Sequence, residues 1–382
     1  MIKNLKLKIK NCISIGIDGN EANLKTRVGV GQYAYNLLRQ LYLLDTKNNY
    51  HIYLKDKPLK DLPKPRKNWH YVVIGPKAFW TKIALPLHLV ITNVKLDYFY
   101  SPGHYSPSPA PLPTIPTIHD IGYLQYPTQF TKKDFYQLVN WTQRSIKQAT
   151  HIIAVSEFTK SELINTYHLK PENISVVYNG TETPPKITSN DTKKVLSKFK
   201  INKAFFLAVG TLKPNKNYPF LIKAFSEFLK HQKTKGQSYQ LVIAGKKGWL
   251  FSDIEKIMSE NSLASEVIFT DYISETEKWA LYQNAEALVI PSTYEGFGIP
   301  AIESQKVGTP VIASHIPPLK EVLETSALFI NPYKINTLIE AFEKILDRKL
   351  RAKLIFEGKK QSRKFTWKLS AKKLISIFNH LN

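Results

Sequence analysis

Two glutamates flank a glycine-containing turn in the last third of the chain. Glu295 is followed by Gly-Phe-Gly at 296–298, and Glu303 comes eight positions after the first glutamate. An apolar run at 287–290 predicts a buried strand before the turn, and a short helix at 304–307, ended by Gly308, is expected after it. A helix N-terminus offers free N–H groups to an anion, and glycine lets a ligand approach the backbone closely. We therefore expect phosphates at the turn, a ribose diol on Glu303 and a sugar beside Glu295.

The stretch from Pro291 to Ser314 resembles the signature of the retaining glycosyltransferases of family 4, which have the GT-B fold. The likeness includes the spacing of the two glutamates, Pro-Ser before them and Gly-Thr-Pro-Val-Ile after them. An ordinary strand–turn–helix with two solvated glutamates is the alternative, but a run of this length rarely arises by chance. The resemblance implies a catalytic role for Glu295. It also implies donor-binding roles for the residues Gly296, Phe297, Gly298 and Glu303.

A lysine follows the predicted strand at 204–209 and precedes a predicted helix. Lys216 at a strand end could neutralise a diphosphate and stabilise the charge that develops on a departing phosphate. The family pattern has a basic pair here, but Asn215 stands where related sequences commonly have arginine. Lys213 could supply the missing charge. We expect Lys216 to be catalytic and Lys213 and Asn215 to bind the donor; a solvated loop lysine is the alternative for Lys216.

The first half of the chain carries two further motifs of the same resemblance. His119 follows a predicted strand at 114–118, in a His-Asp loop that in the family approaches the transferred sugar, so we expect a catalytic role for it. Gly29 and Gly31 precede a predicted helix at 32–44 and resemble the family's first glycine loop. That loop admits the donor phosphate or the acceptor, whereas a plain helix start is the alternative.

Strand and helix patterns alternate along the whole chain, which indicates a parallel α/β architecture. We expect two doubly wound, Rossmann-like domains facing a cleft, as in the GT-B fold. The polar, proline-containing stretch at 180–192 is the best linker candidate. The predicted domains are therefore an acceptor-binding domain at 1–185 and a nucleotide-sugar-binding domain at 192–364. The helix at 366–382 is expected to pack back on the first domain, as is common in the family.

Composition narrows the class of protein further. The single cysteine, Cys12, allows no intramolecular disulfide, and no signal peptide or membrane-spanning segment is evident. The chain has no Asp-x-Asp pair and no His/Cys cluster with zinc spacing. We therefore expect no metal site and no cofactor, with the nucleotide-sugar donor as a co-substrate. No nucleic-acid-binding motif is present, so no nucleic-acid partner is expected.

The net charge of +24 favours an anionic partner, although a lysine-rich composition with solvated charges would also explain it. The basic segment 55–67, together with Phe79, Trp80, Lys77 and Lys82, suggests reversible contact with an anionic membrane. The expected location is the cytoplasm, peripheral to the inner membrane face.

The resemblance implies a retaining, metal-independent hexosyltransferase of polysaccharide biosynthesis that acts on a glycan or lipid-linked acceptor. Its N-terminal passages look most like the mannosyltransferase branch, which favours GDP-mannose as the donor. Two other classes stay open: a non-catalytic nucleotide-sugar-binding protein, and a basic adaptor for membrane or nucleic acid on the same fold. A sugar-nucleotide 2-epimerase or a glucan synthase of similar fold is disfavoured by the branch resemblance.

Overall fold

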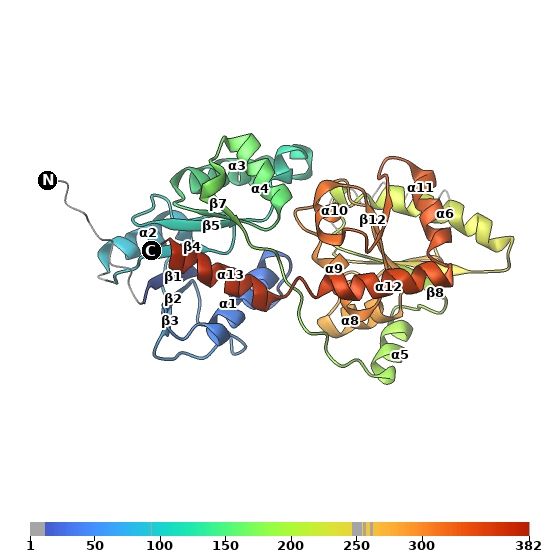
Figure 1. The fold of residues 1–382 in the computed structure, drawn as a ribbon, viewed down its shortest axis with the longest axis horizontal. Coiled ribbons are helices and arrows are strands. Elements are labelled where there is room, and N and C mark those ends of the chain that lie inside the picture. The colour runs from blue at the N-terminus through green and yellow to red at the C-terminus, as the bar shows by residue number, and fades with distance from the viewer. Residues whose placement is uncertain (1–11, 93, 247–253, 255–256, 260–262, 382) are drawn as a thin grey trace. The chain divides into compact units, whose positions relative to one another are not determined.

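The computed structural model describes residues 12–92, 94–246, 254, 257–259 and 263–381. The chain forms two compact units (Figure 1). The first comprises Met1–Leu124, Phe130–Gly180 and Trp367–Asn382, and the second comprises Gln125–Gln129 and Thr181–Thr366. The basic N-terminal residues weighed above as a signal peptide lie outside the described residues.

The first unit is built on a seven-stranded parallel sheet in the order β3-β2-β1-β4-β5-β6-β7. Its strands are β1 (Ser14–Asp18), β2 (Asn49–Leu54), β3 (Trp69–Val73), β4 (Tyr98–Ser101), β5 (Thr114–Ile118), β6 (Ile152–Ala154) and β7 (Ile174–Val176). Its main helices are α1 (Val30–Leu44), a π-helical turn η2 (Trp80–Ala84) that runs into α2 (Leu85–Ile91), α3 (Lys132–Gln148), α4 (Glu157–Tyr167) and α13 (Trp367–His380).

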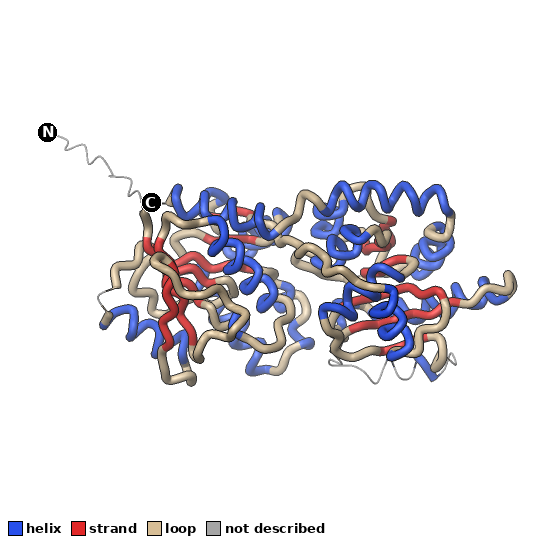
Figure 2. The backbone as a smooth tube through the Cα atoms, turned by 90° about the horizontal axis from the view of Figure 1, so that it is seen from below, coloured by secondary structure: helices blue, strands red, loops and turns tan. Residues whose placement is uncertain are grey.

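The second unit has a six-stranded parallel sheet in the order β10-β9-β8-β11-β12-β13. Its strands are β8 (Ala204–Val209), β9 (Tyr239–Ala244), β10 (Val267–Phe269), β11 (Ala287–Ile290), β12 (Val311–Ser314) and β13 (Leu328–Ile330). The helices are α5 (Ser189–Lys198), α6 (Tyr218–Lys233), α8 (Glu275–Asn284), α9 (Ile299–Val307), α10 (Pro317–Leu323), α11 (Ile335–Lys344) and α12 (Arg348–Ser362). In each unit the strands lie between layers of helix (Figure 2).

Both sheets reverse their strand order once, between β1 and β4 in the first unit and between β8 and β11 in the second. The connections on either side of such a point leave in opposite directions, which opens a crevice beyond the carboxyl ends of the strands, where ligands bind in doubly wound sheets. The two expected doubly wound sheets are therefore present, and each carries one such crevice.

The helix after the glycine turn begins earlier than the residues 304–307 suggested. Gly298 has the left-handed backbone angles φ 94° and ψ 48° and caps a helix that runs from Ile299 to Val307. Pro300, in the first turn, has a fixed φ and lacks an N–H, which suits a helix start. Gly308, at φ 90°, ends the helix as expected from the sequence.

The expected linker contains an unforeseen helix. Thr188 and Asp191 form a reciprocal capping box, in which each side chain accepts a hydrogen bond from the other residue's backbone N–H. This arrangement satisfies two free donors and starts α5 at Ser189. Only the part of the expected linker before this cap is irregular, and the boundary between the units falls at Gly180 and Thr181.

The C-terminal helix α13 packs on α1 of the first unit. Trp367 meets Tyr33 edge to face at 5.7 Å between ring centroids, and Phe378 meets Tyr100 in the same way at 5.5 Å. Edge-to-face aromatic pairs add to the apolar burial. The helix therefore closes the core of the first unit although it is the last element of the chain.

Two glycines allow the ends of β8 and β9 to touch. A Cβ on Gly245 would lie 2.0 Å from the carbonyl oxygen of Gly210, which is backbone and cannot rotate away.

We expect Gly245→Ala to lower the free energy of unfolding by about 3 kcal/mol, because the strand ends must separate. Urea unfolding measures this change. Gly75→Ala, whose Cβ would meet open space, is the control and should change stability little; equal effects of the two variants would contradict the steric argument.

Candidate active site

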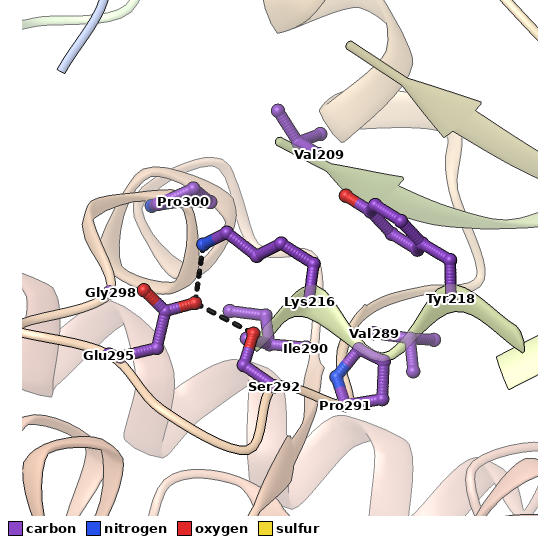
Figure 3. A pocket seen from close by; sticks show the side chains of 10 residues that line it. All are labelled: Val209, Lys216, Tyr218, Val289, Ile290, Pro291, Ser292, Glu295, Gly298 and Pro300. Carbon is purple, nitrogen blue, oxygen red and sulfur yellow. Dashed lines mark hydrogen bonds and ion pairs between the residues drawn. The ribbon is translucent and has the colours of Figure 1, made fainter. Parts of the chain in front are cut away.

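A pocket lies at the crevice of the second sheet, between the ends of β8 and β11 (Figure 3). Val209 and Ile290 line it from the last residues of the two strands. Lys216 reaches in from the loop after β8, and Glu295 reaches in from the loop after β11. The two loops that the sequence marked for chemistry therefore meet in one place.

An ion pair joins these two loops. Lys216 Nζ lies 2.5 Å from Glu295 Oε1, and the same oxygen accepts a 2.7 Å hydrogen bond from Ser292 Oγ. The side chains of Lys216 and Glu295 are only 21% and 12% exposed. Gly210 leaves room for the lysine stem, because a Cβ there would stand 3.3 Å from Lys216 Cε. A partly buried charge pair of this kind is screened less than a surface pair.

Asn215 holds the lysine loop against the neighbouring loop. Its side-chain amide donates to the Tyr294 carbonyl at 3.1 Å, and its own carbonyl accepts the Thr293 N–H at 2.9 Å. Its Oδ1 is buried without a hydrogen-bond partner among the described residues. The position where arginine was expected is thus used to position Lys216. Lys213 precedes the loop's single 3-10 turn and is exposed.

The glycine turn at 296–298 forms the start of α9, and only part of it lines the pocket. A Cβ on Gly298 would lie 2.6 Å from Leu319 Cδ2, so this left-handed position must remain glycine. The Phe297 ring is 3% exposed and packs edge to face on Phe365 at 5.5 Å. Of the three turn residues expected to bind the donor, Gly298 lines the pocket, whereas Phe297 anchors the turn and can meet a ligand only through its backbone. Gly296, half-buried, lies between Glu295 and Phe297.

Glu303 lies on α9 and faces α8. It is 9% exposed; its Oε1 pairs with Lys278 Nζ at 2.8 Å and its Oε2 accepts from the Tyr282 hydroxyl at 3.1 Å. Desolvation by burial lowers the pKa of Lys278, but the charges of Glu303 and Glu275 together outweigh it. The pKa of Lys278 is therefore raised above its ordinary value. Burial, then the Glu303 charge, raises the pKa of the Tyr282 hydroxyl. The carboxylate is therefore fixed in place and keeps lone pairs for a diol.

The first unit gathers its expected residues at the carboxyl edge of its own sheet. Gly29, at φ 49°, caps α1, and Gly31 follows in the first turn, where a Cβ would lie 3.2 Å from the Glu21 carbonyl oxygen. Tyr33, one half-turn further along α1, meets the His119 ring edge to face at 4.7 Å between centroids. The glycine start of α1 and His119 thus belong to one cluster.

A second histidine, His104, stacks on His119 with 5.8 Å between centroids and 9° between ring planes. The His119 backbone N–H donates to His104 Nε2 at 3.2 Å, so the proton of a neutral His104 is on Nδ1, which is buried without a partner among the described residues. His119 Nε2 lies 2.8 Å from the Pro102 carbonyl oxygen and must donate to it, which leaves its Nδ1 as an acceptor. The pair thus leaves a buried donor, His104 Nδ1, and an acceptor, His119 Nδ1, outside these two hydrogen bonds.

His104 was not among the residues expected from the sequence. Its signal was position: Gly103-His104 follows the end of β4 after Pro102, and β4 is the strand beside the reversal in strand order. Burial lowers the pKa of His104 to about 4; burial and, secondarily, the neighbouring His104 lower the pKa of His119 to about 4. Both rings are therefore neutral hydrogen-bonding groups near pH 7.

The described residues lack two further kinds of feature. No group of three or more His, Cys, Asp or Glu side chains among them could hold a metal ion. No helix within the described ranges has the length and apolar character needed to cross a bilayer.

Comparison with known proteins identifies the family. The model "Glycosyl transferases group 1" matches residues 189–361, and the model "Glycosyltransferase Family 4" matches residues 28–183. The first match lies in the second unit and contains Lys216, Glu295 and Glu303; the second lies in the first unit and contains His119. The chain belongs to glycosyltransferase family 4. This membership confirms the resemblance stated from the sequence.

Similar proteins from bacteria support the assignment to this family. The O-antigen chain mannosyltransferase RfbU of Salmonella typhimurium is 36% identical over 217 residues, which are 56% of each chain. The O-antigen chain mannosyltransferase B of Escherichia coli is 25% identical over 290 residues, 75% of each chain. Among solved structures, Anabaena Alr3699/HepE in complex with UDP-glucose has a TM-score of 0.73 at 16% identity, over 96% of this chain and 100% of that one. This likeness confirms the GT-B fold.

The histidine pair predicts a dependence of stability on pH. The unfolded histidines bind protons below about pH 6.5, whereas the folded pair does so only near 4. The unfolded state therefore binds more protons between these values, and stability should fall as the pH falls from about 6.5 to 4, by at most ~1.4 kcal/mol per pH unit per ring.

Thermal unfolding between pH 7 and 5 measures this dependence. His104→Gln should make the dependence shallower, whereas His168→Gln, at an exposed position, should leave it unchanged. The same slope in His104→Gln and in the wild type would show that the pair is not the source.

Proposed function

We propose that the protein transfers mannose from a nucleotide-linked donor, with GDP-mannose the preferred choice, to a glycan or lipid-linked acceptor of a surface polysaccharide, with retention of configuration. The observation that carries the proposal is the Lys216–Glu295 pair at the crevice of the second sheet, beside the N-terminus of α9. The likeness to two O-antigen mannosyltransferases supports mannose and the polysaccharide acceptor.

The second unit would hold the donor. The diphosphate would lie between the α9 N-terminus, whose N–H groups and dipole favour anions, and the Lys216 ammonium. A ribose diol would donate to Glu303, which α8 keeps in place. Because the pairing of Lys216 with Glu295 leaves two ammonium protons available, the lysine can bind phosphate without losing its carboxylate partner. These groups would offset part of the donor's negative charge without a metal ion.

Transfer would then proceed on one face of the sugar. The bond from C1 to the phosphate oxygen breaks with its electron pair going to the phosphate, and the acceptor hydroxyl oxygen bonds to C1 from the same side. The acceptor proton passes to the departing phosphate oxygen, which gives the free nucleoside diphosphate. Lys216 stabilises the charge that grows on that phosphate. His119 Nδ1, an acceptor at neutral pH, would orient a hydroxyl of the transferred sugar.

A lipid-linked acceptor would bring the protein to a membrane face, and the +24 charge supports reversible contact with an anionic one. Two residues expected at this contact serve the fold instead. Trp80 is 1% exposed and donates its indole N–H to the Ile74 carbonyl at 3.2 Å. Arg66 donates to the Asp45 carbonyl at 2.8 Å and lies over the Tyr42 ring at 4.0 Å. The membrane contact must therefore use other side chains.

A panel of nucleotide sugars tests the donor. GDP-mannose and GDP should raise the melting temperature, because a ligand that binds only the folded state stabilises it, and UDP-sugars should do so less. Transfer of labelled mannose to a lipid-linked acceptor, and the anomeric configuration of the product, complete the test. Donor binding with neither transfer nor hydrolysis would mean a non-catalytic binding protein, and no response to any nucleotide would overturn the proposal.

Glu303→Gln should weaken GDP binding about tenfold, because the ribose loses a charge-assisted hydrogen bond. Titration calorimetry with GDP alone measures the dissociation constant. Glu275→Gln is the matched control, since it removes the other carboxylate that pairs with Lys278, at 3.0 Å, but not the proposed ribose ligand. Equal weakening by both variants would show that the effect comes through Lys278 and not through the ribose.

Lys216→Met should lower kcat about a hundredfold and change KM for the donor much less, because phosphate charge is larger in the transition state than in the bound donor. Lys213→Met should mainly raise KM, and the exposed Lys223→Met should change neither constant. Steady-state kinetics separate these cases. A Lys216→Met enzyme with normal kcat and raised KM would restrict this lysine to binding.

A further inference from the structure

Exposed apolar side chains gather on one helix of the first unit. Fifteen large apolar residues are exposed among the described residues, and six of them lie between residues 79 and 94. Five of them are 55% to 69% exposed: Phe79, which precedes η2 in a left-handed conformation, and Ile83, Leu87, Val90 and Ile91, which follow a helical spacing along η2 and α2. The spacing of three or four residues puts these last four on one side of the helix. We call these five side chains the apolar face of α2.

The opposite side of the same helix is buried. Trp80, Ala84 and Leu85 pack into a core cluster with Tyr53 and Phe99 of the sheet. A helix on a protein surface normally exposes polar residues, but here both sides are apolar. Because the inner side is fully packed, the outer side is a fixed feature of the fold and not a product of local unfolding. An exposed apolar patch of this kind marks an interaction surface.

The segment that carries the apolar face has only basic charged residues, one of which, Lys77, pairs with the exposed Asp56 at 2.5 Å. No acidic residue occurs from Lys77 to Leu96, whereas this segment contains Lys77, Lys82 and Lys95. A pocket of about 240 Å³ opens near the end of α2, lined by Leu89, Val94, Lys95, Leu96, Pro111 and Leu112. Five of its six lining residues are apolar, and the sixth is an exposed lysine.

From these observations we propose that the apolar face of α2 is the surface that docks on an anionic lipid bilayer, with its five side chains among the lipid chains and the flanking lysines at the phosphates. Apolar residues beside lysines, on a helix too short to span, are typical of a helix that lies in the membrane interface. Each lysine adds attraction to an anionic surface.

The position of the helix suits a lipid-linked acceptor. The sheet of the first unit is parallel, so the carboxyl ends of β3 and β5 lie along the same edge. The segment from Phe79 begins soon after β3 ends, and His119 directly follows β5. A bilayer that contacts the start of this helix would therefore meet the edge of the sheet where the sugar is expected. The inference rests on the proposed lipid-linked acceptor only for this link to catalysis.

Vesicle flotation of the full chain, without donor or acceptor, tests the docking. The protein should bind phosphatidylglycerol–phosphatidylcholine vesicles and bind pure phosphatidylcholine much less. Replacing Ile83, Leu87 or Ile91 singly with Ser should lower the partition coefficient about tenfold each. Phe356→Ser, an equally exposed apolar position on α12, is the matched control and should have no effect. Changing Lys77 and Lys95 to Gln should weaken binding at low salt and matter little at high salt.

A second measurement reports insertion directly. An environment-sensitive fluorophore on Leu87→Cys, in a Cys12→Ser background, should shift to the blue on anionic vesicles, whereas the same label on Phe356→Cys should not. Three results would overturn the proposal. The first is loss of vesicle binding in Phe356→Ser as well, and the second is no fluorescence shift at position 87. The third is a dimer in solution that the Ile83→Ser change dissociates. Vesicle binding without mannose transfer would leave the docking intact and contradict only the proposed function.

Discussion

The ion pair between Lys216 and Glu295 connects the two loops on which the second unit's site depends. It spans the crevice where the strand order reverses, and Ser292 and Asn215 fix its two sides by hydrogen bonds to the glutamate and to the adjoining loop. A flexible lysine would lose several rotamers on binding a phosphate. Held at 2.5 Å from Glu295, it has already lost them, so its charge is in place before a donor arrives. This geometry depends on two glycines. A side chain at Gly298 would clash with Leu319 at the start of α9, and a side chain at Gly210 would crowd the Lys216 stem.

The motifs that identified the family were local, and for that reason the sequence revealed them. Glu295, Glu303 and the glycines between them lie within one strand–turn–helix, whose order follows from apolar runs and glycines alone. Elements with strong local signals also have the expected bounds: β5, β8 and β11 match residue for residue. The predicted start of α9 was wrong because one left-handed glycine and a proline, not the apolar pattern, decide where that helix begins.

What the sequence could not show were contacts between distant segments. Lys278 and Tyr282 approach Glu303 across two helices, and His104 approaches His119 across two strands. Neither pairing has a spacing that a single sequence could reveal. The same limit applies to the proposed membrane contact. Trp80 and Phe79 are neighbouring aromatic residues, and only the backbone geometry shows that the first is core and the second is exposed.

The two units share a common way of handling charge. In the second unit, the proposed ligand-binding groups are a lysine and a carboxylate that already neutralise each other, together with helix N–H groups. In the first unit, two histidines are kept neutral by burial. A site built in this way presents little unpaired charge to water before the substrates bind, although the surface as a whole is strongly positive. Substrate charge would then be met by the remaining ammonium protons of the paired lysine and by helix N–H groups, rather than by ions drawn from solution, which is how a transferase of this fold can stabilise a departing diphosphate through its own residues.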